Sequence, residues 1–116
     1  MDKVIKITTD NNVKEVCFDL DNYGELYSAL GGYPTIVRTK TIYKFCGSDV
    51  VMIVDDDGFQ KKLAPNLVGS LMYTPGMIVG DVLFCKEVGA ELVGFRTEEV
   101  FFLRDKFIKQ CECIRR

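Results

Sequence analysis

Three cations stand close together near the middle of this 116-residue chain, at Arg38, Lys40 and Lys44. Guanidinium and ammonium groups hold phosphate oxygens, and an arginine can do so through two parallel hydrogen bonds. Tyr33 precedes the cations and Tyr43 lies between Lys40 and Lys44, and aromatic rings stack on nucleobases. This pattern predicts a binding site for a small anionic, nucleotide-like ligand. The alternative is a solvated strand face whose lysines discourage pairing between sheet edges.

A corner with the sequence Leu-Ala-Pro-Asn adds one more polar side chain, Asn66, which we include among the candidate ligand-binding residues. Just before it, Asp55–Asp57 and Gly58 form an acidic run. A calcium loop of the EF-hand type needs oxygen ligands at alternating positions and a glutamate at the twelfth. Counted from Asp55, the fifth residue is Phe59 and the twelfth is Asn66. The run is therefore interpreted as a turn, with magnesium held by two carboxylates as the alternative, and no metal site is predicted.

Other chemistry is restricted by what the chain contains. There is no histidine, which excludes nucleophile systems of the Ser-His and Cys-His type. Neither a phosphate-binding loop nor a dinucleotide-binding glycine motif is present. The five cysteines are scattered and odd in number, which indicates buried or incidental thiols and not a disulfide scaffold or a zinc site. We therefore predict a protein without enzymatic activity or cofactor; catalysis by Asp55, Asp57 and Asp81 is the alternative.

The composition is that of one globular domain spanning residues 1–116. Hydrophobic residues make up 47% and charged residues 28%, and the formal net charge is −2, values that argue against disorder. The chain has no apolar run of about 20 residues and no signal-peptide pattern at its start. We expect a cytoplasmic protein without a membrane partner. The slightly acidic charge also argues against binding to genomic nucleic acid.

Hydrophobic periodicity and turn residues predict the elements that must position these side chains. Strands are predicted at 3–9, 13–18, 33–45, 50–54, 59–63 and 77–88. Helices are predicted at 21–30, 67–72 and 97–114. The fold class is α+β: a mainly antiparallel sheet of about six strands, a short helix in the N-terminal half and a longer amphipathic helix at the C-terminus. The three cations share one face of the strand predicted at 33–45.

The C-terminal helix carries more apolar surface than one core-facing stripe requires. Acids in its first turn and Arg115 and Arg116 at its end suit the two ends of the helix dipole. Phe101 and Phe102 are adjacent, so both cannot face the same core. We expect one of these rings to contact a second copy of the chain in a homo-oligomer. A wide buried helix face within a monomer is the alternative.

Four short motifs resemble a family of small proteins found in phages and mobile elements of Gram-positive bacteria, a family classified as a domain of unknown function. They are the Gly-Gly-Tyr turn at 31–33, the strand and acidic turn at 52–58, the Leu-Ala-Pro-Asn corner at 63–66 and the Ile-Val-Gly-Asp strand at 78–84. The chain departs from the family pattern at Ala64-Pro65 and in its long last helix. The resemblance implies an accessory protein of a mobile element that acts against host defence.

Two functions are therefore expected. The first is a non-enzymatic binding protein that sequesters a phosphate-bearing signalling nucleotide on Arg38, Lys40 and Lys44. The second is an inhibitor that binds a host defence or regulatory protein through the sheet edge or through the exposed side of the C-terminal helix. The first requires cations and aromatic rings that converge on one site. The second requires an exposed apolar surface or an unpaired strand.

Overall fold

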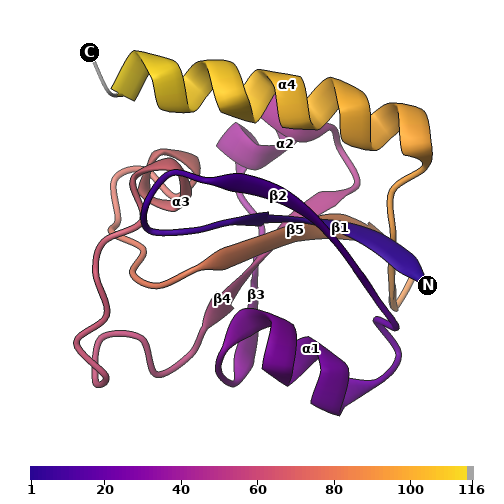
Figure 1. The fold of residues 1–116 in the computed structure, drawn as a ribbon, viewed down its shortest axis with the longest axis horizontal. Helices are drawn as coiled ribbons and strands as arrows, with labels where there is room; N and C mark the ends of the chain where they lie inside the picture. Colours follow the sequence, from indigo (N-terminus) through magenta and orange to yellow (C-terminus); the bar gives the residue numbers. More distant parts are fainter. Residues whose placement is uncertain (115–116) are drawn as a thin grey trace.

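The fold is one antiparallel sheet with helices on both faces (Figure 1). The computed structural model describes residues 1–114, and within them the sheet has six strands in the order β2-β1-β5-β4-β3, with β6 paired to β5. The strands are β1 (Asp2–Ile7), β2 (Val13–Phe18), β3 (Pro34–Val37), β4 (Val50–Asp55), β5 (Val82–Val88) and β6 (Glu91–Val93). The helices are α1 (Tyr23–Leu30), α2 (Lys40–Cys46), α3 (Leu67–Met72) and α4 (Thr97–Ile114). The predicted α+β class is confirmed.

Strand β4 is buried along its whole length because both faces of the sheet are covered. Its residues alternate between two cores, as a strand with a period of two must do. Met52 and its neighbours at even positions pack with α2, α3 and α4, whereas Val51 and Ile53 pack with α1. Figure 1 shows the same division, with α1 on one side of the sheet and the other three helices opposite.

Local sequence signals account for the elements that were predicted correctly. β1 and β2 form the expected antiparallel hairpin, with Lys3 opposite Cys17. The helix predicted to begin at Asp21 begins at Tyr23, because Asn22 caps α1 by accepting a hydrogen bond from the Glu25 amide; Gly31 ends the helix at a φ of 88°. α3 and α4 occupy the predicted ranges. Arg115 and Arg116 lie outside the described residues.

The strand predicted at 33–45 is wrong, because the structure divides this segment into β3 and α2. Thr39 makes the division. Its hydroxyl accepts a hydrogen bond from the Ile42 amide at 3.1 Å and donates one to the Met72 carbonyl at 2.7 Å. The helix then buries Ile42 completely. Capping and burial of one apolar face outweigh the strand preference of β-branched residues.

Two further strand predictions need correction. Residues 59–63 form successive turns, because the Asp57 and Gly58 amides bond to Asp55 and the Lys61 amide bonds to the Asp57 carbonyl. The strand predicted at 77–88 begins only at Val82, since Gly80 takes a φ of 81°. The short strand β6 was not predicted. The expected strand number is therefore right, although the set of strands differs.

Candidate functional site

The structure does not bring the predicted ligand-binding residues together. Tyr33 packs edge-on against Tyr27 of α1, with ring centroids 5.1 Å apart. Tyr43, Lys40 and Lys44 belong to α2, which covers the opposite face of the sheet (Figure 1). The two lysines are exposed and, four residues apart on a helix, lie on one side of it. The two tyrosines therefore flank no common site.

Arg38 is engaged with another side chain of the same chain. Its Nε and Nη2 atoms donate hydrogen bonds of 2.7 and 2.6 Å to the two carboxylate oxygens of Glu87 on β5. This hydrogen bonding raises the pKa of Arg38 and lowers the pKa of Glu87. A phosphate ligand would have to displace the carboxylate to use the fork of the guanidinium.

Asn66 is fully buried and positions the backbone. Its Nδ2 donates hydrogen bonds to the carbonyls of Ile7 and Gly80, both at 3.0 Å, and its Oδ1 accepts one from the Gly69 amide at 2.9 Å. The side chain thus caps α3 and joins β1 to the start of β5. It presents no atom to a ligand at the surface.

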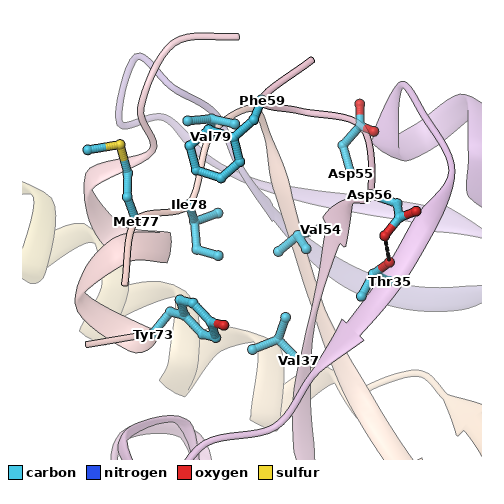
Figure 2. Close-up of a pocket in the computed structure, with 10 residues that line it drawn as sticks. All are labelled: Thr35, Val37, Val54, Asp55, Asp56, Phe59, Tyr73, Met77, Ile78 and Val79. Carbon is cyan, nitrogen blue, oxygen red and sulfur yellow. Dashed lines mark hydrogen bonds between the residues drawn. The ribbon is translucent and has the colours of Figure 1, made fainter. Parts of the chain in front are cut away.

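A different set of residues surrounds a cavity of about 200 Å³ beside β3. Thr35 and Val37 of β3 form one side of this pocket, and Tyr73 and Met77 from the connection between α3 and β5 form the other (Figure 2). Val54 of β4 lies between the two sides, on the sheet. The remaining lining residues are Asp55, Asp56, Phe59, Ile78 and Val79.

The acidic turn supplies the polar side of the pocket. Asp55 is buried, accepts a hydrogen bond from the Asp57 amide at 2.9 Å and pairs with Lys61 Nζ at 2.7 Å. The hydrogen bond to Asp55 raises the pKa of Lys61. Gly32 permits this arrangement, because a Cβ there would lie 2.3 Å from an Asp55 carboxylate oxygen. Asp55 is thus neutralised and has a structural role.

Asp56 has a different environment from Asp55. It is exposed, and its Oδ1 accepts a hydrogen bond of 2.7 Å from the Thr35 hydroxyl (Figure 2). Within residues 1–114, no ion pair involves this carboxylate. Asp56 therefore places a negative charge at the mouth of the pocket, next to the edge strand.

The loop after α3 forms the apolar side of the pocket, and hydrogen bonds with Ser70 fix the position of this loop. Ser70 Oγ accepts a hydrogen bond from the Ile78 amide at 2.9 Å and lies 3.2 Å from the Ile78 carbonyl, to which it donates. Gly76 leaves room for the Tyr73 ring, since a Cβ there would approach the ring to 2.3 Å. Phe59 and Met77 are 66% and 54% exposed. Exposed apolar side chains around a hollow are typical of a binding surface.

The size and lining of the pocket limit what it can bind. Pockets for whole small molecules usually have volumes of about 300 to 1,000 Å³, so about 200 Å³ suits one large side chain. The lining is apolar with a carboxylate at the rim, which favours a cationic neighbour and repels phosphate. Within residues 1–114, no group of three acidic, cysteine or histidine side chains is placed to hold a metal ion.

Sequence reasoning singled out part of this pocket without predicting a pocket there. The acidic run at 55–57 was interpreted as a turn, and the structure shows that Asp56 of this run also faces a hollow. Tyr73 and Met77 have no sequence signal of their own, because only the folding of the 73–79 loop against β3 and β4 makes them neighbours of Thr35 and Val37.

Comparisons with family models, with curated proteins and with solved structures give no match for this chain. The resemblance to a phage and mobile-element family stays a prediction. The function has to be inferred from the geometry of the chain itself.

Proposed function

We propose that this protein acts without catalysis, as a binding protein whose partner is another polypeptide. The pocket beside β3 would hold one large side chain of that partner. The observation that carries this proposal is a cavity of about 200 Å³ with exposed apolar walls and one carboxylate at its rim. Large side chains buried in such pockets supply most of the affinity of many protein interfaces.

The charges favour a polypeptide over a nucleotide at this site. Asp55 and Asp56 line the pocket, no lysine or arginine is among the described residues that line it, and Lys61 is paired with Asp55. A phosphate group would meet a net negative surface there. A peptide with an apolar and a basic side chain would satisfy both the walls and the rim.

A pull-down with the tagged protein as bait tests the proposal, with a cell lysate as the source of partners. We expect a protein recovered in stoichiometric amount by the wild type, and its loss from the double variant Phe59→Ser, Tyr73→Ser. Tyr23→Ser is the matched control, because Tyr23 is 57% exposed on α1, at the opposite face of the sheet. Equal recovery by all three proteins would contradict a role for the pocket.

Sequestration of a nucleotide stays a prediction, supported by the exposed pair Lys40 and Lys44 on α2. Calorimetry with cyclic di- and trinucleotides and ADP-ribose derivatives tests it. Failure to bind any of them more tightly than about 10 µM, roughly −7 kcal/mol, would reject it. A host defence or regulatory protein as the partner, and a role in counter-defence, rest on the family resemblance and also stay predictions.

A further inference from the structure

We infer that the partner segment is an extended strand that pairs with the free edge of β3, and that it carries a lysine or arginine two residues from a large apolar residue. This inference rests on the proposed function and specifies the chemistry of the partner. It follows from three features of the described residues: an unpaired strand edge, the direction of the β3 side chains and the charge at the pocket rim.

The first feature is the edge itself. β3 ends the sheet, and its only strand neighbour within residues 1–114 is β4. The Asp56 amide donates a hydrogen bond to the Tyr33 carbonyl at 2.8 Å, which fixes the pairing pattern. In an antiparallel ladder, successive residues point their backbone groups alternately toward and away from the neighbour. Pro34 and Ile36 therefore direct their backbone groups outward, where a second strand could pair.

Proline in this position restricts the pairing to a short segment. Pro34 lacks an N–H group, so the outer edge offers its carbonyl together with the amide and carbonyl of Ile36. Prolines on edge strands prevent indiscriminate pairing between sheets. The affinity of a partner strand would then depend on its side chains as well as on its backbone, as in other cases of strand addition.

The second feature is the direction of the β3 side chains. Thr35 and Val37 point into the pocket (Figure 2), whereas Ile36 packs on the opposite face with the α1 core. An added strand alternates in the same way, so two of its side chains, at positions i and i+2, would project over the pocket about 7 Å apart. One would lie beside Thr35 and the other beside Val37.

The third feature is the charge at the rim. The position beside Thr35 is next to the Asp56 carboxylate, which accepts the Thr35 hydroxyl hydrogen bond. Val37 lies across the pocket from the Tyr73 ring (Figure 2), so the position beside Val37 is the nearer of the two to that ring. A basic side chain suits the first position and a large apolar side chain suits the second. The strand direction decides which of the two comes first in the partner sequence.

Selection from a displayed library of random nine-residue peptides on the wild-type protein tests the inference. We expect enriched peptides with a basic and a large apolar residue at i and i+2. Binding of a synthetic enriched peptide, measured by fluorescence anisotropy, should weaken at least about tenfold with Asp56→Asn. Asp10→Asn, in the exposed β1–β2 turn, is the matched control and should leave binding unchanged.

Backbone pairing is tested on the same peptide by N-methylation of one residue at a time. Strand addition predicts losses of at least about tenfold at alternate residues and little change at the residues between. Two results would overturn the inference and leave the proposed function standing. Enriched peptides could lose binding with Phe59→Ser, Tyr73→Ser yet lack the basic residue, or the effect of N-methylation could fail to alternate along the peptide. If no enriched peptide loses binding with Phe59→Ser, Tyr73→Ser, both are overturned.

Discussion

Asn66 and Asp55 are the buried polar side chains among residues 1–114, and both organise the chain around the pocket. A buried polar group is costly unless it is hydrogen-bonded, so each has a full set of partners. Asn66 fixes the start of α3, and Asp55 fixes the turn after β4. Asp55 therefore fixes the beginning, and Asn66 the end, of the segment that links β4 to α3 beside the pocket.

Replacement of Asn66 by alanine should strongly destabilise the fold. The substitution leaves the Ile7 and Gly80 carbonyls and the Gly69 amide without their partner. We expect a loss of about 3 kcal/mol or more in the free energy of unfolding, measured by urea denaturation. Asn22→Ala removes an exposed cap of the same residue type from α1 and should cost about 1 kcal/mol. Equal losses in the two variants would show that burial of Asn66 does not increase its contribution to the free energy of unfolding.

The thiols should differ in reactivity according to their burial. Burial raises the pKa of the Cys46 and Cys85 thiols to about 12, so both stay protonated at neutral pH. Cys111 is also buried, whereas Cys17 and Cys113 are exposed. Titration of the native protein with a disulfide reagent should show two fast thiols, and all five should react after unfolding. Loss of the fast phase in a Cys17→Ser, Cys113→Ser variant would identify them.

At the scale of elements, the segment after Gly32 shows why the local sequence pattern was insufficient to predict its secondary structure. Alternation along 33–45 is equally compatible with one long strand or with a short strand and a helix, because Ile42, Phe45 and Cys46 also have helical spacing. The Thr39 cap and its hydrogen bond to Met72 decide for the helix. β3 remains the last strand of the sheet, so its outer edge lies free beside the pocket.

The ion pair between Arg38 and Glu87 joins the end of β3 to β5 and should make stability depend on pH. Because hydrogen bonding to Arg38 lowers the folded-state pKa of Glu87, its stabilising effect is present above the unfolded pKa of about 4.3 and is lost as the pH falls through the folded pKa. Glu87→Gln should therefore lower the melting temperature at pH 7 and have no effect at sufficiently acidic pH.

A series of thermal melts between pH 2.5 and pH 7 measures this difference. Glu91→Gln is the control, because Glu91 is exposed on β6 and forms no ion pair within the described residues. A difference in melting temperature between Glu87→Gln and the wild type that stays constant over the whole pH range would contradict a stabilising role for the Arg38–Glu87 ion pair.

At the scale of the whole molecule, the outer side of α4 is an exposed apolar region apart from the pocket beside β3. Phe101 and Phe102 are 69% and 67% exposed, so neither ring is used by the core. The interpretation of a wide helix face buried within a monomer does not hold for these two rings. Lys106 lies with its Nζ 5.6 Å from the Phe102 ring centroid and 4.4 Å from that of Phe45. None of the helices described, α4 included, is both long and apolar enough to cross a membrane.

Homo-oligomerisation through these rings stays a prediction, and the mass of the protein in solution tests it directly. Sedimentation equilibrium of the wild type should give a mass above 13.1 kDa, and the double variant Phe101→Ser, Phe102→Ser should sediment as a monomer, since it lacks the two exposed rings that would form the contact. Tyr23→Ser on α1 should not change the mass. A wild type that is monomeric at high concentration would reject the prediction.

The sequence alone determined the fold class, the β1–β2 hairpin, the buried strand β4 and the helices α1, α3 and α4, because each depends on caps and hydrophobic periods within a few residues. Only the tertiary structure decided where 33–45 changes from strand to helix and that Arg38 pairs with Glu87. It also decided that Asp56, Thr35 and Tyr73 share a pocket. These are contacts between residues far apart in the chain, and their energies are set by packing, which no local pattern records.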